Sequence, residues 1–328
     1  MADKMADHVL DERDQRLIGA LQCDGRLTAE RAGEVLGMSA RTVHRRWQAL
    51  AAEGVCRVIA LPARPDPVGA MVLRIRVLGS KLDALTAALA ARPDIPFIDV
   101  SASGDEILAV SLTRPGTRDH LVFRELPATR AVTSVTADTI LHVFAEASDW
   151  RHGVLSDAER AALTPPRGDT QGASDEVDRD ILAALEDDAR APAAAVAART
   201  GHPDSTVRRR IARLAATGRL RTQVVVDPKR LGLCIDANVL MRVAPDRLDP
   251  VGRALATHPA VHGAFATTGT ANLQAAVWVR DLDHLYRFIT RDLGGLGVDG
   301  VETVIIGQAV KRPGRSPFPA RLAVSDRV

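Results

Sequence analysis

Hydrophobic positions recur every three or four residues in three short stretches near the start of the chain. The first, residues 11–21, opens with acidic residues that suit the N-terminus of a helix. The second follows Thr28, a residue type that caps helices. The third carries Val43, Trp47 and Leu50 on one face. Three short amphipathic helices are therefore expected.

A glycine-containing turn, Gly37-Met38-Ser39, separates the second stretch from the third, and Ser39 can cap the helix that follows. Three short helices with such a turn before the last predict a helix-turn-helix. Gly54 ends the third helix. Residues 56–61 follow as an extended stretch, which we expect to be a wing or a connecting strand.

The pattern then changes to the alternation typical of strands. The order strand, helix, strand, strand, helix, strand predicts a ferredoxin-like antiparallel sheet with both helices on one face. The other face is apolar by pattern, and a second copy of the same sheet is the obvious cover. The strands are expected at 72–77, 95–103, 107–112 and 132–143, and the helices at 81–91 and 117–126.

The chain repeats this unit. With an offset of 164 and no gap, residues 11–57 align on 175–221. In the second copy Pro203 stands where Ser39 stood, so Asp204 or Ser205 is expected to cap the third helix. The second sheet is expected from strands at 237–243, 261–267, 273–279 and 301–311, with helices at 247–257 and 282–293.

The predicted class is therefore α+β, with two winged helix-turn-helix domains and two ferredoxin-like βαββαβ domains in tandem. The linker holds one short helix, for which Ser156 and Glu159 form a capping box. The expected domains are helix-turn-helix 1–62, sheet domain 63–146, linker 147–174, helix-turn-helix 175–228, sheet domain 229–312 and flexible tail 313–328.

Composition narrows the class of protein. The chain has 328 residues and a formal net charge of only +2, so any nucleic-acid interface depends on local clusters of charge. Its three cysteines are widely spaced, which argues against a disulfide framework and a cysteine zinc site. The N-terminal residues lack an apolar signal segment, and no apolar run approaches the roughly 20 residues that span a bilayer. We expect a cytoplasmic protein with no membrane partner, no metal and no cofactor.

Arginines on the third helix of each unit indicate double-stranded DNA as a partner, because the guanidinium fork pairs with guanine or phosphate. A solvated charged helix face is the plainer alternative; the repeated helix-turn-helix favours DNA. Arg46 and Arg210 border the buried stripe, so a structural ion pair is equally open for them. The candidate contacts are Arg41, Thr42, His44, Arg45, Arg46, Gln48, Ser205, Thr206, Arg208, Arg209, Arg210 and Arg213.

The two third helices differ. The second is richer in arginine, whereas the first carries His44 and Gln48, with Arg208 and Ala212 at the corresponding positions. We therefore expect the two units to read different half-sites of an asymmetric operator.

The stretch LDERDQRLIGALQCDGRLTAERAGEVLGMSARTVHRRWQALAAEGVCRV resembles the helix-turn-helix of the Lrp/AsnC transcriptional regulators. That resemblance implies a DNA-binding regulator whose sensing domains pair face to face, as a covalent pseudo-dimer or a homo-oligomer. It also implies a small effector, usually an amino acid, beside a glycine-containing loop. The family favours a carboxylate three positions after that glycine, where this chain has Ile107 and Asn272. The implied effector-binding residues are Gly104, Asp105, Glu106, Gly269, Thr270, Asn272 and Thr303.

Two other readings concern the second sheet domain. His258 and His262 have the spacing of metal ligands, but Pro259 breaks any helix between them. The architecture also resembles the siroheme decarboxylases, which would need histidines and arginines such as His258, His262, Arg253 and Arg280 to hold tetrapyrrole carboxylates. The basic third helices are unnecessary for that chemistry, so it is kept as the alternative.

Overall fold

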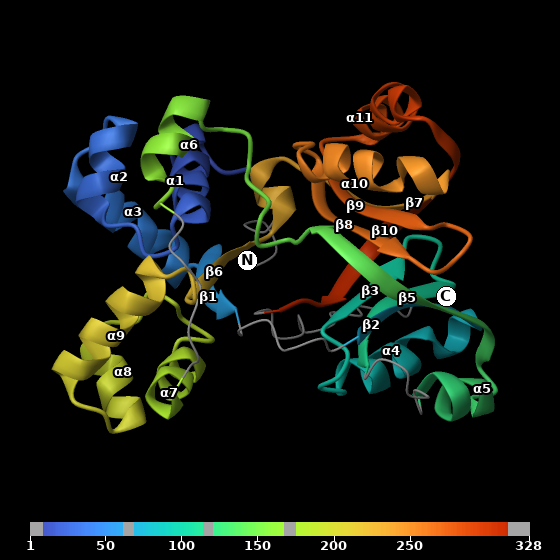
Figure 1. The fold of residues 1–328 in the computed structure, drawn as a ribbon, viewed down its shortest axis with the longest axis horizontal. Coiled ribbons are helices and arrows are strands. Elements are labelled where there is room, and N and C mark those ends of the chain that lie inside the picture. Colours follow the sequence, from blue (N-terminus) through green and yellow to red (C-terminus); the bar gives the residue numbers. More distant parts are fainter. Residues whose placement is uncertain (1–8, 62–68, 114–120, 167–174, 314–328) are drawn as a thin grey trace, which may run out of the picture.

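The computed structural model describes residues 9–61, 69–113, 121–166 and 175–313. They form a pair of helical heads and a β-barrel with helices around it (Figure 1). Each unit supplies one head and half of the barrel. The predicted α+β class is confirmed.

The first head contains the three expected helices. Asp11, Thr28 and Ser39 each accept a hydrogen bond from the backbone N–H three residues later. Caps of this kind stabilise a helix by about 1 kcal/mol each. The helices are α1 (Glu12–Cys23), α2 (Ala29–Leu36) and α3 (Ala40–Ala52).

The second head repeats this arrangement with one correction. Neither Asp204 nor Ser205 caps its third helix; Pro203 occupies the N-cap position with no side-chain hydrogen bond. The proline ring fixes φ near the value that a helix start requires, so Asp204 is already inside the first turn. The helices are α7 (Glu176–Ala184), α8 (Ala193–Thr200) and α9 (Asp204–Ala216).

The heads are joined by a two-stranded sheet. Strand β1 (Cys56–Leu61) pairs antiparallel with β6 (Arg221–Val226). The extended stretches are thus connecting strands between units, because each finds its partner in the other head. One hydrophobic core continues through both heads.

Two arginines at equivalent positions of the units donate hydrogen bonds across this joint. The Arg26 guanidinium donates to the carbonyl oxygen of Ala189, and Arg190 donates to those of Gly25, at 2.8 Å, and Leu27, at 3.1 Å. These charge-assisted hydrogen bonds fix one head against the other.

The two sheets close on each other within the chain. The order around the barrel is β10-β3-β4-β2-β5-β8-β9-β7, so β5 crosses to pair with β8 and β10 crosses to pair with β3. The expectation that a second copy covers the open sheet face is confirmed, and that copy is the chain's own. The strands are β2 (Gly69–Val77), β3 (Phe97–Ser101), β4 (Glu106–Thr113), β5 (Val132–Ala145), β7 (Ile235–Val243), β8 (Val261–Thr267), β9 (Leu273–Val279) and β10 (Val298–Lys311).

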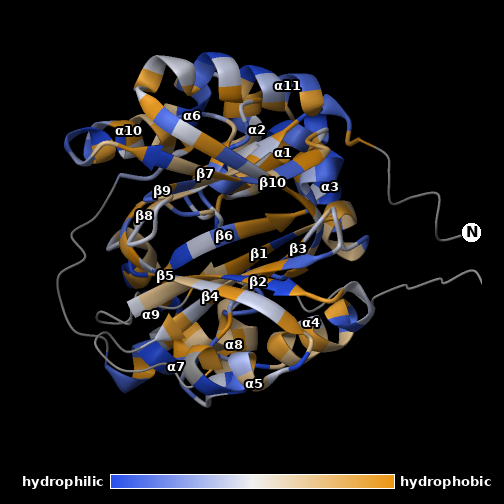
Figure 2. Ribbon diagram, turned by 90° about the vertical axis from the view of Figure 1, so that its right-hand side faces the viewer, coloured by the Kyte–Doolittle hydropathy of each residue, from blue (hydrophilic) through white to orange (hydrophobic). Residues whose placement is uncertain are grey.

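Helices cover the outer faces of the barrel, with α4 and α5 beyond one sheet and α10 and α11 beyond the other (Figure 2). Most apolar strand residues point toward these helices. The face between the sheets keeps only a small apolar cluster of Leu108, Leu240 and Val304, so the prediction of an apolar inner face was wrong in large part. The helices are α4 (Leu82–Ala90), α5 (Leu126–Ala128), α10 (Leu248–Ala256) and α11 (Leu282–Arg287).

Two predicted helices are altered. The helix expected at 117–126 lies partly outside the described residues; the described part is a π-helical turn, Leu121–Glu125, followed by α5. The one expected at 282–293 turns π-helical at Phe288–Asp292. Short 3-10 turns at Gly79–Lys81, Pro228–Leu231, Pro245–Arg247 and Gly294–Leu296 complete the connections.

The first part of the predicted linker belongs to the first head. It forms α6 (Asp157–Leu163) with the expected capping box of Ser156 and Glu159. Leu155 and Leu163 are buried in the core of the heads, so this segment packs there. Residues 167–174 and the tail at 314–328 lie outside the described part. No helix in the described ranges has the length and apolarity needed to cross a bilayer.

Candidate nucleic-acid interface and effector pocket

The outward face of α3 carries the polar residues that the sequence assigned to DNA. Arg41, His44, Arg45 and Gln48 are exposed, and Thr42 is half-buried at the first turn. Within the described ranges, neither arginine has an ion-pair partner or a side-chain hydrogen bond. Their guanidinium groups are available for phosphate oxygens or base edges.

Arg46 points back toward α1. Its Nη1 lies 2.7 Å from Asp14 Oδ1 and 3.0 Å from Asp11 Oδ2. The backbone N–H of Asp14 and the Arg46 guanidinium hold the pKa of Asp11 below its usual value. Arg210 repeats this pattern in the second head, with Nη1 2.6 Å from Asp175 Oδ2. Of the two roles left open for these arginines, the structure shows the ion pair.

The outward face of α9 is less free than its sequence suggested. Ser205, Arg208 and Arg209 are exposed and Thr206 is half-buried. Arg208 Nη2 lies 2.6 Å from Asp204 Oδ2, one turn earlier on the same helix. In the described part of the chain, Arg209 alone among the arginines of α9 lacks such a carboxylate partner.

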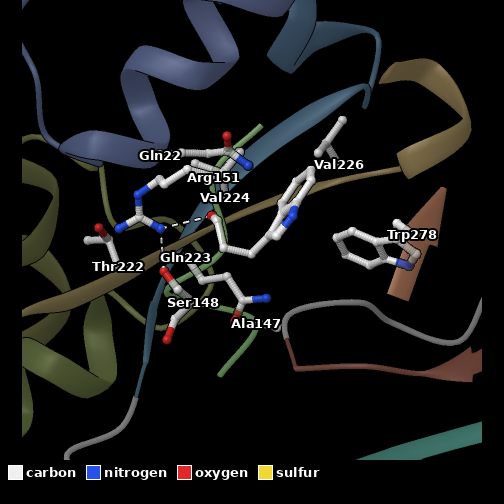
Figure 3. A pocket seen from close by; sticks show the side chains of 10 residues that line it. Gln22, Ala147, Ser148, Arg151, Thr222, Gln223, Val224, Val226 and Trp278 are labelled. Carbon is white, nitrogen blue, oxygen red and sulfur yellow. Dashed lines mark hydrogen bonds between the residues drawn. The ribbon is translucent and has the colours of Figure 1, made fainter. Parts of the chain in front are cut away.

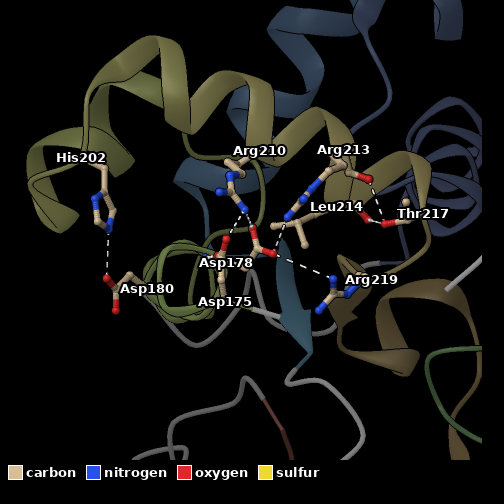
Figure 4. Close-up of polar contacts among 9 residues, drawn as sticks. All are labelled: Asp175, Asp178, Asp180, His202, Arg210, Arg213, Leu214, Thr217 and Arg219. Atoms are coloured by element: carbon tan, nitrogen blue, oxygen red, sulfur yellow. Dashed lines mark hydrogen bonds and ion pairs between the residues drawn. The ribbon is translucent and has the colours of Figure 1, made fainter. Parts of the chain in front are cut away.

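Three arginines converge on one buried carboxylate in the second head (Figure 4). Asp178 is fully buried, and its oxygens lie 3.1 Å from Arg210 Nη1, 2.5 Å from Arg213 Nη2 and 3.9 Å from Arg219 Nη1. A buried carboxylate without partners is strongly destabilising, so these arginines serve the fold. Arg213, predicted to contact DNA, pairs with Asp178 through Nη2 while its side chain stays 48% exposed.

The predicted effector loop of the first unit is a tight turn between β3 and β4. Gly104 has a φ of +73°, which glycine adopts without strain. Ser103 Oγ donates to Asp105 Oδ1 at 2.5 Å, and this hydrogen bond holds the pKa of Asp105 below its usual value. Asp105 therefore closes the turn.

Glu106, next in the chain, belongs to a charged bridge between the units. Arg74 on β2 donates through Nε to Glu106 Oε1 at 2.7 Å and through Nη2 to Glu302 Oε1 at 2.7 Å. Glu302 comes from β10 of the second unit. The hydrogen bond from Arg74 lowers the pKa of Glu302.

An open cavity of about 310 Å³ surrounds this bridge. Arg76 is exposed on its wall, and within the described ranges its guanidinium has no ion-pair partner. The cavity thus offers carboxylates together with an uncommitted cation, which suits a small molecule carrying both charges. It is lined by Arg74, Arg76, Glu106, Ser134, Thr136 and Glu302.

In the second predicted effector loop, other parts of the chain already contact the residues that were assigned to the effector. Asn272 donates through Nδ2 to the Val243 carbonyl oxygen at 2.8 Å and accepts from the Val243 N–H at 3.0 Å. A Cβ built on Gly269 would lie 2.5 Å from Asp138 Oδ2, so β5 closes directly over this loop. Thr270 is exposed, and Thr303 is half-buried on β10.

The pattern at the second loop also lacks the bridging arginine. Leu240 of β7 pairs with β10 at Glu302, and Arg74 of β2 pairs with β5 at Thr136. Leu240 therefore occupies the position in the second unit that corresponds to Arg74 in the first. Leu240 cannot hold a carboxylate. The two predicted effector sites therefore differ, and a polar cavity accompanies the first.

Sequence reasoning missed Arg74, Arg76 and Glu302. The signal was available, because Arg74 and Arg76 interrupt an apolar strand at alternate positions and so share one face of it. Glu302 could not be associated with them without knowing that β10 reaches the other unit's sheet.

A second polar cluster is buried between the sheets. Asp99 of the first unit and Asp236 of the second both face Arg312, whose Nη2 contacts Asp99 and lies 3.7 Å from Asp236 Oδ2. Burial raises the pKa of Asp99 to about 6. His262 stacks on Trp278 with ring centroids 3.7 Å apart, and burial lowers the pKa of His262.

The residues proposed for tetrapyrrole binding do not share a site. His258 Nε2 lies 3.3 Å from Asp292 Oδ2, and Arg253 pairs with Asp249 at 2.7 Å on the surface of α10. Arg280 is exposed, whereas His262 is buried between the sheets. In the ranges that the structure describes, no group of three or more His, Cys, Asp or Glu side chains could hold a metal ion.

Heads and barrel meet at Trp150, in the segment between β5 and α6. Its indole Nε1 donates to the Pro259 carbonyl oxygen at 2.8 Å, and its ring meets Trp278 edge-on at a centroid distance of 5.0 Å. A small cavity beside these rings is lined from both bodies, including Gln22 of α1 in the first head and Trp278 of β9 in the barrel (Figure 3). The barrel is therefore packed directly against the heads.

Known protein families match the parts just described. The AsnC-type helix-turn-helix domain matches residues 10–51 and 175–215. The Lrp/AsnC ligand binding domain matches residues 236–315. Two helix-turn-helix matches in one chain agree with the two heads.

Curated relatives align with about half of the chain. The HTH-type transcriptional regulator FL11 of Pyrococcus horikoshii is 29% identical over 147 residues, covering 44% of this chain and 96% of the relative. An uncharacterized HTH-type transcriptional regulator of the same organism is 32% identical over 139 residues, covering 42% of this chain and 88% of the relative. One unit of this chain thus corresponds to a whole regulator.

A solved structure matches the two-unit architecture. The siroheme decarboxylase NirDL has a TM-score of 0.57 at 14% identity, with 94% of this chain and 95% of that chain covered. At this identity the likeness concerns the fold alone. The helix-turn-helix and ligand-binding matches, together with the regulator relatives, show that the chain belongs to the Lrp/AsnC family.

Proposed function

We propose that the protein is a sequence-specific DNA-binding transcriptional regulator whose two heads act as one body. The observation that carries this proposal is the face of α3, where Arg41, His44, Arg45 and Gln48 are exposed beside each other. A helix presenting such residues can enter the major groove and read base edges.

The joint between the heads supports the same proposal. The β1–β6 sheet and the reciprocal hydrogen bonds of Arg26 and Arg190 hold two recognition helices in one fixed relation. A dimeric regulator obtains this arrangement by pairing two chains. Here one chain provides both heads, so we propose that a single chain binds both halves of its operator.

We propose that a small zwitterionic effector, of the amino-acid class, binds in the cavity of the first unit. The Arg76 guanidinium, which has no ion-pair partner among the described residues, would take its carboxylate, and Glu106 or Glu302 its ammonium group. The cavity lies at the contact between units, because β10 brings Glu302 to the sheet that carries Arg74. A ligand there would alter how the two halves of the barrel meet.

We propose that contacts between chains in a homo-oligomer use surfaces other than the sheet faces. The sheet faces by which sensing domains would pair are already closed within the barrel. We therefore propose the single chain as the DNA-binding unit, to be checked by its mass in solution under the conditions of the DNA experiment.

The proposal is tested by selecting bound duplexes from a random DNA pool with the full chain. Enrichment of a defined sequence is expected, with affinity that falls as salt rises. A pool that stays random through successive rounds at low salt would overturn the proposal.

The enzymatic alternative rests on the fold shared with the siroheme decarboxylase. We propose a regulator instead, because His258, His262, Arg253 and Arg280 are dispersed and His262 is engaged by Trp278. Incubation with iron-uroporphyrin III separates the two functions: no shift in its Soret absorption is expected, and a stoichiometric shift would favour the enzyme.

A further inference from the structure

We propose that sequence readout is concentrated in the first head, and that the second head mainly grips the DNA backbone. This inference rests on the proposed DNA-binding function and assigns its specificity to one of the two recognition helices. It refines the expectation from sequence that the two units read different half-sites.

The second head uses several of its arginines in contacts with its own carboxylates. Arg210 and Arg213 lie against buried Asp178, and Arg219 lies 3.9 Å from the same carboxylate. In the first head, Ala49 and Val55 stand at the positions of Arg213 and Arg219. Arg213 and Arg219, which have no arginine counterpart in the first head, thus lie near the carboxylate of the fully buried Asp178.

The remaining positions favour the first head as reader. Its outward positions Arg41, His44, Arg45 and Gln48 correspond to Ser205, Arg208, Arg209 and Ala212. Arginine and glutamine have forked groups that make two hydrogen bonds to one base, and alanine has none. The first head therefore has more groups that distinguish bases.

The charge at the start of each recognition helix also favours readout by the first head. Asp204 opens α9, where α3 has Ala40, and its carboxylate pairs with Arg208 at 2.6 Å. An acidic group at the helix start opposes approach to DNA, and breaking the pair to free Arg208 has an energetic cost. Among the arginines of α9, Arg209 has no carboxylate partner in the part of the chain that the structure describes, and one such cation is sufficient to contact a phosphate.

The matched variants Arg45→Ala and Arg209→Ala test this inference in the full chain. Both residues are exposed at equivalent positions, so unfolding midpoints near that of the wild type are expected for both. DNA is selected from a random pool with all three proteins, and affinities are measured for the wild-type consensus and for a scrambled duplex.

The wild type should select one well-defined half-site with a weakly defined flank. Arg45→Ala should lower affinity for the consensus about 10-fold or more and remove base preference at one or two positions. Arg209→Ala should weaken consensus and scrambled DNA by a similar, smaller factor and leave the selected sequence unchanged. Two equally defined half-sites, or altered base preference in Arg209→Ala, would overturn the inference while leaving the DNA-binding function intact. A pool that stays random with the wild type would overturn both.

Discussion

Arg213 of α9 lies 2.5 Å from the fully buried carboxylate of Asp178. In the first head the equivalent position is Ala49, and the corresponding aspartate, Asp14, is paired with Arg46. The two equivalent helices thus differ at this position: α9 has an arginine that pairs with a buried carboxylate of its own head, and α3 has an alanine.

We expect Arg213→Ala to reduce the stability of the heads. It removes one of the partners of a buried carboxylate, and with Arg210 and Arg219 still near Asp178 the loss should be about 1–2 kcal/mol. Chemical unfolding of the full chain, followed by circular dichroism, measures it. Arg209→Ala is the matched control and should stay within about 0.5 kcal/mol of the wild type. Equal stability of the two variants would contradict the structural role of Arg213.

The joint between the heads is sensitive at Gly25. A Cβ there would overlap the Thr222 side chain on β6, so Gly25→Ala should destabilise the pair of heads by about 1–3 kcal/mol through overpacking. Gly153→Ala, whose Cβ would meet nothing within 4 Å, is the control. The unfolding midpoints of the two variants measure the difference. A Gly25→Ala protein as stable as the control would contradict the tight contact of the first head with β6.

The buried Asp99 predicts a pH dependence of stability. Burial raises its pKa to about 6 from a usual value of 3.8, so the folded state prefers the protonated carboxyl. The associated stabilisation is complete below pH 3.8 and is lost as the pH rises through 6. Asp99→Asn removes this dependence, and relative to the wild type it should gain about 1–3 kcal/mol between pH 5 and pH 7.5.

His262 changes the unfolding free energy with pH in the opposite direction, so the wild type must be compared with Asp99→Asn. Burial lowers the pKa of His262, so its contribution is lost as the pH falls through the usual range of histidine. Both proteins contain His262, and its effect largely cancels in the difference of their unfolding free energies. A difference that is the same at both pH values would contradict a raised pKa for Asp99.

The effector proposal predicts one ligand per chain. At least one of the common amino acids should raise the thermal unfolding midpoint of the protein. Calorimetry with that amino acid should give a stoichiometry near one per chain. Arg76→Ala should abolish the response, because it removes the uncommitted cation of the cavity. Arg242→Ala, at the corresponding position of the second unit, should retain it. Two sites per chain, or a full response in Arg76→Ala, would argue against this pocket.

Local structure was largely predictable from the sequence, since helix caps such as Thr28 and Ser39 and the alternation in the strands depend on neighbouring residues. The cover of one sheet by the other followed from the repeat. Contacts between elements that are distant in the sequence were not predictable in the same way. Nothing in residues 56–61 specifies β6 as their partner, and nothing local reveals that α6 packs on the first head.

At the candidate site, exposure of Arg41 and Arg45 followed from the helical period, whereas the direction of Arg213 did not. Arg213 lies on the outer side of the helix and its side chain stays about half exposed. Only the burial of Asp178 on a neighbouring helix explains why its guanidinium pairs with that carboxylate. The charged cavity was missed for a related reason, because Arg74 and Glu302 are 228 positions apart in the chain.

The proposed function depends most on specific DNA binding by the intact chain. The direct measurement is the dissociation constant for the selected duplex and for a scrambled duplex of equal length, each at several salt concentrations. Affinity for the selected duplex should be at least about 1,000-fold higher, and both affinities should fall steeply as salt rises. Equal affinities for the two duplexes, or binding that salt does not alter, would contradict the proposed function.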